Sequence, residues 1–427
     1  MPALQRAIVF TRCPVPGQTK TRLAARLGEL PAAELHRRMA EATVTCARDA
    51  CGQVDGDLEV TYSDADWRTM RRWLGGGILY RRQPLGDLGQ RMAGAMQRAL
   101  LDGARRVVLV GTDVPNVRPG HFREAWQALR EVDLVLGATR DGGYWLIGAR
   151  RPVDVFDGIA WSTDSVLQRT LELARRQNLR THVLPPMADV DCAEDLDVVP
   201  DDWRTDRPVI SVVVPALHEE ENIEASLASA RRVGVELLVC DGGSTDGTTR
   251  RARDAGAKIL HSPPARARQM NRGARAAAGR ILLFLHADTL LPSDYARQVF
   301  VSLLDRQVVG GGHAWSATTD GLAMGLARRY VNFRTRYRGE PWGDQAIFVR
   351  RCVFEQLGGF PDVPIAEDWF FVRSLRRRGR MAMVPSPVVT SARRWQRIGV
   401  ARTFAINLVI VAGCHLGVPT PWLSKLY

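Results

Sequence analysis

The sequence is poor in lysine: Lys20, Lys258 and Lys425 are the only three among its 427 residues. Arginine supplies nearly all of the positive charge, and a compositional bias of the genome explains most of this preference. The sequence also lacks helix-turn-helix, zinc-finger and stacked-aromatic patterns, so its formal net charge of +13 is not expected to serve nucleic acid. An anionic lipid or a nucleotide diphosphate remains as the partner of a basic domain.

Cysteine is scarce, and its seven positions follow no pattern. There is no CxxC pair and no histidine at metal-ligand spacing, so we expect reduced thiols rather than a zinc site. A signal peptide is not expected, because the N-terminal residues pass straight into a predicted strand at 7–10. The longest late apolar run, 404–413, includes Asn407 and is too short to span a bilayer. These absences predict a cytoplasmic protein.

The length and the charge distribution predict two domains. A chain of 427 residues is long for one hydrophobic core. Residues 1–205 carry 28 Lys and Arg against 27 Asp and Glu, a net charge of +1, whereas residues 206–427 carry 31 against 19, a net charge of +12. The step falls in a polar, proline-bounded stretch. We therefore expect domains at 1–202 and 209–427, joined by a linker at 203–208.

A loop suited to phosphate follows the first predicted strand. In the segment RCPVPGQTKTRL, prolines and a glycine shape a loop, and Arg12, Lys20 and Arg22 gather just before a predicted helix. Backbone N–H groups at a helix start, together with such cations, favour a di- or triphosphate. The alternative is a solvated basic turn.

Carboxylates follow further predicted strands of the first half. Asp113 comes directly after the apolar strand at 106–111, where ligands and metals lie in open α/β sheets, and its oxygens suit Mg²⁺. Asp191 is a candidate second metal ligand; the alternative is that 189–195 only cap a helix. Asp141 precedes two glycines that allow the backbone to approach a ligand closely, and we include it in the predicted nucleotide site.

These motifs give residues 7–199 a family resemblance. The segments RxPxPGxxKTRL, GDLGxRM, GTDVP, DGGYWLIG and DVDCAEDL resemble a GT-A-like family of uncharacterised sugar-transferase-like proteins. More distantly, they resemble phospholactate guanylyltransferase and molybdenum-cofactor nucleotidyltransferases. The glycine-rich Gly-Gly-x-Ser/Thr-x-Arg-Met-Gly loop of true nucleotidyltransferases is absent, and the proline-containing loop takes its place. The resemblance implies nucleotide binding, but it does not extend to nucleotidyl transfer.

Two apolar strands of the second half end in acidic residues. VVVPALHEEEN places Pro215 and Glu219 at the end of one strand, and LVCDGGSTDGT places Asp241 at the end of the next. Glu219 suits hydrogen bonds from a ribose or base, although the three glutamates at 219–221 also complement a helix dipole. Arg268 is a candidate contact for the base or diphosphate, and the alternative is a surface arginine cluster. These segments resemble the opening of a family 2 glycosyltransferase on the GT-A fold.

The resemblance implies a metal site at Asp288. The apolar strand ILLFL runs into His286-Ala-Asp288, at the position of the metal-binding Asp-x-Asp motif of GT-A transferases. Here His286 replaces the first acid, which leaves Asp288 as the single carboxylate. One aspartate and two phosphate oxygens are ordinary ligands of Mg²⁺ or Mn²⁺. The alternative is a structural aspartate at a strand end.

The pair Glu367-Asp368 resembles the catalytic pair of inverting family 2 enzymes. The resemblance implies that Asp368 is the general base, because a sugar hydroxyl needs a proton acceptor to become a good nucleophile. Both acids also suit the start of a helix, and the two interpretations are compatible. Trp342 and Asp344 fall where such enzymes shape the acceptor pocket, and the alternative for Asp344 is a loop cap.

The second half is most similar to a glycosyltransferase subfamily associated with arsenosugar biosynthesis. This resemblance rests on the phrases HADT and GDQAIFVRR and on the C-terminal segment 417–427. The first half resembles the usual companion of that subfamily. Some relatives are named as carotenoid-acid glycosyltransferases, so a lipid is an alternative acceptor. The arginines at 373–402 lead into an apolar stretch at 403–411, a pattern that suggests contact with a membrane surface. A C-terminal helix buried on the sheet is the plainer interpretation.

The sequence therefore predicts an α/β protein with two tandem GT-A-like, Rossmann-like domains. The predicted activity is metal-dependent, inverting transfer of a sugar from a nucleotide diphosphate to a hydroxyl acceptor, with Mg²⁺ or Mn²⁺. In one alternative the first half makes the activated sugar by nucleotidyl transfer. In another it is an inert binding module, since resemblance to a catalytic fold does not establish catalysis.

Overall fold

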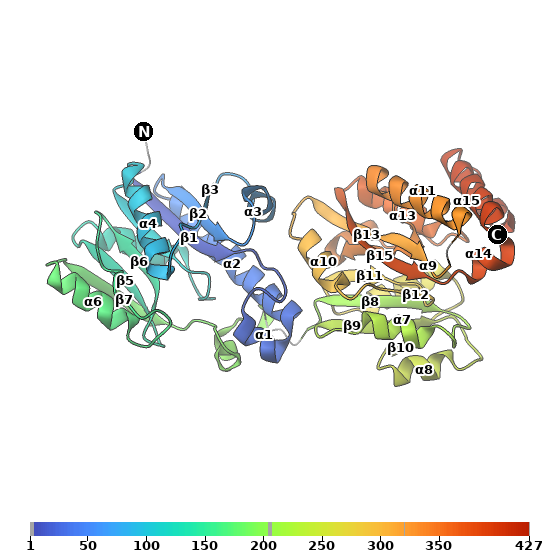
Figure 1. Cartoon of the computed structure of the whole chain (residues 1–427), viewed down its shortest axis with the longest axis horizontal. Coiled ribbons are helices and arrows are strands. Elements are labelled where there is room, and N and C mark those ends of the chain that lie inside the picture. The colour runs from blue at the N-terminus through green and yellow to red at the C-terminus, as the bar shows by residue number, and fades with distance from the viewer. Residues whose placement is uncertain (1–3, 204–206, 320, 427) are drawn as a thin grey trace. The chain divides into compact units, whose positions relative to one another are not determined.

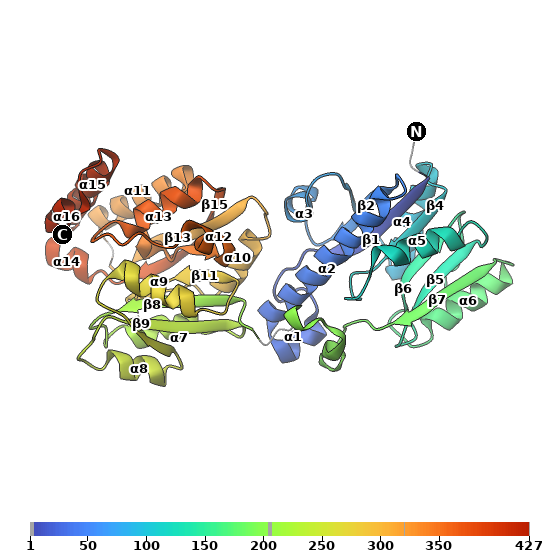
Figure 2. The same cartoon turned by 180° about the vertical axis from the view of Figure 1, so that it is seen from behind.

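The computed structural model describes residues 4–203, 207–319 and 321–426. The chain divides into two compact units, Met1–Thr205 and Asp206–Tyr427. The division falls inside the predicted linker at 203–208, of which residues 204–206 lie outside the described residues. Each unit is an α/β structure in which helices cover a twisted sheet (Figures 1 and 2).

The described residues of the first unit form a seven-stranded sheet in the order β3-β2-β1-β4-β6-β5-β7. Apolar residues of β1 and β4, which neighbour each other in the sheet, are completely buried, as expected for central strands covered on both faces. The strands are β1 (Gln5–Arg12), β2 (Asp57–Ser63), β3 (Leu79–Arg82), β4 (Arg106–Val110), β5 (Leu134–Thr139), β6 (Tyr144–Ala149) and β7 (Thr181–Met187). The α-helices are α1 (Thr21–Leu27), α2 (Glu29–Gly52), α3 (Trp67–Leu74), α4 (Leu88–Leu101), α5 (Pro119–Ala128) and α6 (Val166–Arg176), followed by short 3₁₀ helices η1 (Ala193–Val198) and η2 (Asp201–Trp203).

The described residues of the second unit form an eight-stranded sheet in the order β10-β9-β8-β11-β14-β13-β15-β12. The strands are β8 (Ile210–Ala216), β9 (Val235–Asp241), β10 (Lys258–His261), β11 (Ile281–Phe284), β12 (Thr289–Leu290), β13 (Val308–Ala317), β14 (Phe348–Arg350) and β15 (Arg380–Thr390). The helices are α7 (Ile223–Ala230), α8 (Thr248–Asp254), α9 (Arg266–Ala276), α10 (Tyr295–Ser302), α11 (Leu322–Arg338), η3 (Gly343–Gln345), α12 (Arg351–Leu357), α13 (Glu367–Arg376), α14 (Arg393–Ile398), α15 (Val400–His415), α16 (Thr420–Leu423) and η4 (Ser424–Leu426).

The two sheets share one topology. In each, four parallel strands occur in the order third, second, first, fourth, and an antiparallel strand then pairs with the fourth (β6 on β4, β14 on β11). The carboxyl ends of the parallel strands therefore meet at one edge of each sheet, where ligands bind in open α/β folds. The predicted tandem arrangement of two α/β domains is confirmed. No described helix is both long enough and apolar enough to cross a membrane.

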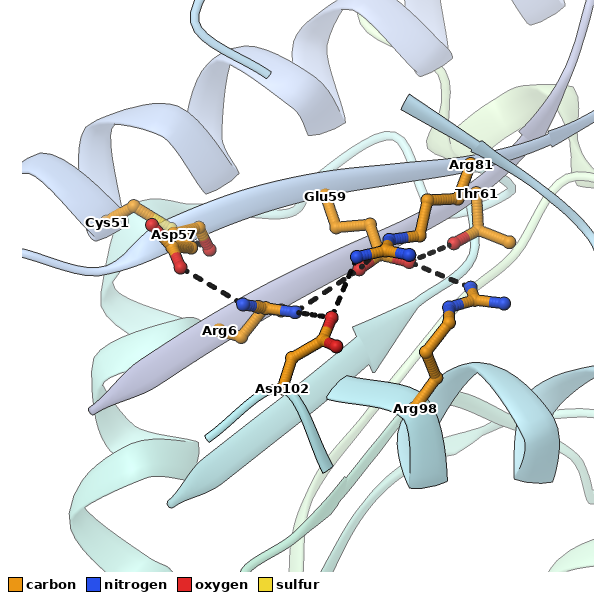
Figure 3. Close-up of polar contacts among 8 residues, drawn as sticks. All are labelled: Arg6, Cys51, Asp57, Glu59, Thr61, Arg81, Arg98 and Asp102. Carbon is orange, nitrogen blue, oxygen red and sulfur yellow. Dashed lines mark hydrogen bonds and ion pairs between the residues drawn. The ribbon is translucent and has the colours of Figure 1, made fainter. Parts of the chain in front are cut away.

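A polar cluster is buried inside the first unit (Figure 3). Glu59 on β2 is completely buried, and its Oε1 accepts hydrogen bonds from Thr61 Oγ1 at 2.9 Å and Arg98 Nη2 at 3.1 Å. Guanidinium nitrogens of Arg6 and Arg81 each lie 3.7 Å from its Oε2. One carboxylate thus joins β1, β2, β3 and α4 at the core of the sheet.

Replacing Glu59 by Ala is expected to destabilise the first unit by about 3–5 kcal/mol, because it removes the carboxylate that the buried Arg6 shares with the partly exposed Arg81 and Arg98. The measurement is urea-dependent hydrogen exchange of peptides from β1 and β2. The exposed Glu131 of the same unit, replaced by Ala, is the control. Equal urea midpoints for the two variants would show that the cluster does not stabilise the fold.

Candidate active site

The ends of β8 and β9 are tied together at the carboxyl edge of the second sheet. Gln269 is buried, and its Nε2 donates to the carbonyl oxygens of Ala216 and Cys240, at 2.8 Å each. Asp241 is only 2% exposed, and its carboxylate accepts the N–H of Gly243 at 3.0 Å and that of Ser244 at 3.1 Å. The carboxylate thereby orders the glycine loop that follows β9.

Glu219 lies beside this loop and is held from both sides. Its Oε2 accepts hydrogen bonds from Asn222 Nδ2 at 2.8 Å and from Arg393 Nη2 at 2.6 Å. Its backbone N–H donates to Thr248 Oγ1 at 2.8 Å. Arg393 begins α14, far away in the sequence, and sequence analysis assigned it only to a basic surface. Nothing in the local sequence indicates its contact with Glu219, since this contact depends on where α14 lies after β15 in the folded chain.

Asp288 follows β11 and faces Glu219. Burial raises the pKa of Asp288, the Glu219 carboxylate raises it further, and Arg393 opposes both effects. Thr289 Oγ1 donates to Asp288 Oδ1 at 3.4 Å, a weak contact that leaves most of its acceptor capacity free. Within the described ranges, no three His, Cys, Asp or Glu side chains are grouped to hold a metal ion. Two facing carboxylates with spare lone pairs nevertheless suit a divalent cation whose other ligands come from phosphate.

Asp368 is positioned by the backbone of η3. Its Oδ2 accepts the N–H of Gly343 at 2.5 Å, and its Oδ1 accepts the N–H of Trp369 at 2.7 Å. A Cβ added to Gly343 would lie 2.9 Å from His286 Nε2 and 3.1 Å from Asp368 Oδ2, so these three residues meet. Burial lowers the pKa of His286 to about 3, which keeps its ring neutral. His286 therefore adds no positive charge beside Asp368.

Two further acids are crowded around Asp368. Glu367 begins α13 after Ala366, which has a left-handed backbone with φ 64°, and it is 7% exposed. Burial raises the pKa of Glu367 to about 7, with a further contribution from Asp368. Burial also raises the pKa of Asp344 to about 6; Arg334 opposes this shift, whereas Asp368 and Asp288 add to it. The negative charges of Asp288 and Asp368 therefore both act on the carboxyl group of Asp344.

The predicted acceptor residue Trp342 is held by a buried arginine. The Arg334 guanidinium lies 3.5 Å from the centroid of the Trp342 ring, and its Nη2 donates to Gln345 Oε1 at 3.2 Å. Burial lowers the pKa of Arg334 to about 10. A small cavity of about 180 Å³ adjoins this stack. It is lined by Glu340, Pro341, Trp342, Trp369, Val372, Arg373, Arg376 and His415.

The two arginines at the start of α9 have different surroundings. Arg268, the predicted donor contact, is paired with Asp362 at 2.9 Å, and both side chains are exposed. Arg266, which sequence analysis did not single out, is close enough to Glu367 and Asp288 to lower the pKa of both carboxyls.

Pro215 is buried in β8, where its register partner is Cys240. The donor roles of Pro215 and Arg268 stay predictions.

The first unit also gathers its predicted residues at the carboxyl edge of its sheet. Lys20 Nζ lies 2.6 Å from Asp113 Oδ1, 2.8 Å from Asp191 Oδ1 and 2.6 Å from the carbonyl oxygen of Val190. Burial lowers the pKa of Lys20, but the two carboxylates outweigh it and raise the pKa. The ammonium lies between the two predicted metal ligands, so a metal ion between them would have to displace it.

The remaining predicted residues of the first unit lie around this group. Asp141 Oδ1 accepts from Thr139 Oγ1 at 2.5 Å and from the N–H of Gly143 at 3.1 Å. Arg12 donates from Nη1 to the carbonyl oxygen of Gln18 at 3.1 Å, and Arg22 is exposed. The predicted cap around 189–195 is present, because Asp195 accepts the N–H groups of 191 and 192 just before η1. Nucleotide binding here stays a prediction.

Two family models match the chain, one in each unit. Residues 31–163 match a family described as "uncharacterized protein conserved in bacteria (DUF2064)", and residues 211–351 match glycosyl transferase family 2. Glycosyltransferase AglE of Haloferax volcanii is 27% identical over 175 residues. This alignment covers 36% of the chain and 57% of AglE, so the chain spans less than two thirds of that curated relative.

Solved structures each resemble about half of the chain. A structure from Desulfovibrio desulfuricans, provisionally assigned as a nucleotide-diphospho-sugar transferase, is 36% identical and covers 46% of this chain and 86% of its own, with a TM-score of 0.43. Glucosyl-3-phosphoglycerate synthase of Mycobacterium tuberculosis, solved with Mn²⁺, UDP and glucosyl-3-phosphoglycerate, is 25% identical over 50% of this chain and 81% of its own, with a TM-score of 0.38. Mannosyltransferase PcManGT of Pyrobaculum calidifontis, solved with GDP-Man and Mn²⁺, is 21% identical over 52% and 73%, with a TM-score of 0.37.

The two sheets share one strand order, and a glycosyl transferase family 2 match falls in the second unit. The predicted fold class, two tandem GT-A-like domains, is confirmed. The family 2 assignment is confirmed for residues 211–351, whereas the resemblance to the arsenosugar-associated subfamily stays a prediction.

The raised pKa of Glu367 predicts how stability depends on pH. Native Glu367 keeps its proton up to about pH 7, whereas the unfolded chain releases it near 4.5, so stability falls as pH rises through this window. We expect Glu367→Gln to reduce this pH-dependent loss of unfolding free energy by on the order of 3 kcal/mol. The measurement is urea denaturation at pH 5 and pH 8, with the exposed Glu224→Gln as control. Identical pH dependence in both variants would contradict the assignment.

Proposed function

We propose that the chain is a glycosyltransferase that transfers a sugar from a nucleotide diphosphate to a hydroxyl acceptor with inversion, and the match of residues 211–351 to glycosyl transferase family 2 supports this. The observation that carries the proposal is the meeting of Asp288, Asp344 and Asp368 at the carboxyl edge of the second sheet. Such a group supplies what the reaction needs: a holder for the donor diphosphate and a proton acceptor for the incoming hydroxyl.

The donor would bind where β8 and β9 end. Asp241 orders the loop after β9, and Glu219 lies beside it with one carboxylate oxygen engaged by Asn222 and Arg393. The other oxygen of Glu219 is available to a ribose or base. Arg266 is exposed at the start of α9 and in electrostatic reach of Asp288, which suits it to the negative charge of a leaving diphosphate.

A divalent cation would be held by Asp288 and by phosphate oxygens of the donor. The mutual repulsion of Asp288 and Glu219 supports this, because a cation at Asp288 would relieve it. The ion would neutralise charge on the diphosphate as it leaves. The Pyrobaculum and Mycobacterium enzymes were solved with Mn²⁺, and for this chain we propose Mg²⁺ or Mn²⁺.

Asp368 would act as the general base. Both of its oxygens accept backbone hydrogen bonds, which fix the direction of the carboxylate. In the transfer step the acceptor oxygen bonds to the anomeric carbon as its proton passes to Asp368. The bond between that carbon and the diphosphate oxygen breaks, and the electron pair leaves with the diphosphate. Attack from the face opposite the leaving group inverts the anomeric centre.

The acceptor would enter beside Trp342 and Asp344. We include in this proposal a small-molecule or lipid-like acceptor, a cytoplasmic location and peripheral membrane contact through the basic C-terminal region. The resemblance of the HADT and GDQAIFVRR phrases supports a role in arsenosugar biosynthesis, although no residue of the site is specific for arsenic.

Replacing Asp368 by Asn is expected to lower sugar transfer about 10³-fold, because the amide cannot take the acceptor proton. Asp288→Ala is expected to lower it as strongly and to remove its dependence on added Mn²⁺ or Mg²⁺. Transfer and donor hydrolysis are measured with a panel of nucleotide sugars, and the exposed Asp294→Asn is the control. Full transfer by Asp368→Asn would refute the role of this residue.

A second activity is favoured by the meeting of Lys20, Asp113 and Asp191 in the first unit. If this unit makes the activated sugar, the protein releases pyrophosphate from a nucleoside triphosphate and a sugar phosphate. We then expect Asp113→Ala to abolish this release and Asp294→Asn to preserve it. If the unaltered protein releases no pyrophosphate from any of the four common nucleoside triphosphates, this second activity is refuted. The alternative, in which the first unit is a binding module, then stands.

A further inference from the structure

Helix α11 carries apolar residues on two opposite sides. Its buried side holds Met324, Ala327 and Val331, as a surface helix normally does, and with them the polar Arg334 (5% exposed) and Thr335 (1% exposed). A second set of apolar residues, on the opposite side, lies in solvent. They are Leu322 (94% exposed), Leu326 (67%), Tyr330 (38%), Phe333 (62%) and Tyr337 (70%). Their spacing of four, four, three and four residues places them on one face of the helix.

The candidate site engages the polar residues on the buried side of α11. Arg334 stacks on Trp342 and donates to Gln345, and Thr335 Oγ1 donates to the same Gln345 oxygen at 3.0 Å. These contacts, together with the buried apolar residues, fix the orientation of the helix. Most of the apolar side chains on its opposite side stay exposed, and a contiguous exposed apolar patch marks an interaction surface.

Helix α15 extends this surface. Figures 1 and 2 show α15 beside α11, and the rings of Tyr330 and Phe404 meet at a centroid distance of 5.0 Å. Leu408 and Val409 of α15 are 41% and 53% exposed, and Trp422 of α16 is 71% exposed. The inner side of α15 is buried, because Ile410 and Cys414 pack with Trp369 of α13, whereas its outer side is exposed. The plainer interpretation of the sequence is therefore right in that the helix has a buried side, and it is corrected in that this side packs on α13. The exposed apolar side chains of α11, α15 and α16 are here called the apolar face.

The charged side chains of the helices that carry the apolar face are all positive. The last acidic residue of the sequence is Asp368, and residues 369–427 contain ten Lys and Arg. Helix α11 contains five arginines and no acid, and its exposed Arg329 and Arg336 come three residues after Leu326 and Phe333, on the same side of the helix. Two copies meeting through this face would oppose like charges, which disfavours self-association. An anionic lipid surface complements both the arginines and the apolar side chains.

We propose that the apolar face docks the second unit on an anionic lipid surface and that the acceptor is a hydroxyl-bearing lipid held there. The second part rests on the proposed function. The small cavity lined by Trp342 and Trp369 links the two parts. His415 of α15 also lines that cavity and packs on Trp369, the residue after Asp368, at a ring-centroid distance of 4.9 Å. Helix α11 reaches its wall through Arg334, whose guanidinium stacks on Trp342. Docking through α11 and α15 brings lipid to the acceptor side.

The test is flotation of the full chain with vesicles of phosphatidylcholine, with and without phosphatidylglycerol. We expect binding to the anionic vesicles, at least about tenfold weaker binding to phosphatidylcholine alone, and weakening of the anionic binding at high salt. The double variant Leu326→Gln/Phe333→Gln is expected to lose binding at least about tenfold. The matched control is Leu101→Gln/Val233→Gln, which changes two exposed apolar residues elsewhere (80% and 66% exposed) and is expected to bind as the unaltered protein does.

Donor hydrolysis without vesicles separates this inference from the proposed function. Hydrolysis of a nucleotide sugar with no vesicle binding would overturn the docking surface alone. Vesicle binding with no turnover of any nucleotide sugar would overturn the transferase proposal and leave the docking surface standing. A dimer in light scattering that Leu326→Gln/Phe333→Gln dissolves would identify the face as a contact between copies and overturn the lipid assignment. Circular dichroism of the double variant checks that the fold is retained.

Discussion

The buried amide of Gln345 holds together the part of the second unit on which the candidate acceptor site depends. Its Oε1 accepts hydrogen bonds from Arg334 Nη2, Thr335 Oγ1 and the N–H of Trp342, at 3.0–3.2 Å. Its Nε2 donates to the carbonyl oxygen of His313 at 2.8 Å. Breaking any of these contacts leaves a buried polar group unpaired, so the network has one favoured arrangement. β13, α11 and η3 are consequently fixed relative to one another.

Two features on opposite sides of α11 follow from this network. On the inner side, Trp342 is fixed, the backbone at Gly343 is fixed with it, and the N–H of Gly343 then directs the carboxylate of Asp368. On the outer side, the helix exposes leucines and aromatic residues, because Arg334 and Thr335 are held on the inner side together with the buried Met324, Ala327 and Val331. The direction of the Asp368 carboxylate and the exposure of the apolar face therefore both depend on how α11 is held.

The acidic residues of the site could be predicted because strand ends follow a simple geometric rule. An apolar run that ends in Asp241 or Asp288 places the acid at the edge where parallel strands converge, and local sequence is enough to see it. The arginines could not be predicted in this way. Arg266 and Arg268 lie two positions apart on one helix, and only the packing of α9 decides that Arg268 pairs with Asp362 while Arg266 acts on the site. Arg393 reaches Glu219 from a helix 174 residues further along the chain.

The sequence by itself determined the two-domain α/β architecture and the acids at the carboxyl edges, since burial patterns and strand ends are local properties. Only the tertiary structure decided which cations meet those acids. It placed Lys20 between Asp113 and Asp191, and Arg393 against Glu219. It also turned Arg334 inward beside the buried apolar residues of α11 and left a second apolar stripe of this helix exposed. The physical reason is that a buried charge or amide must find its partners, and those partners come from distant segments whose proximity no local pattern records.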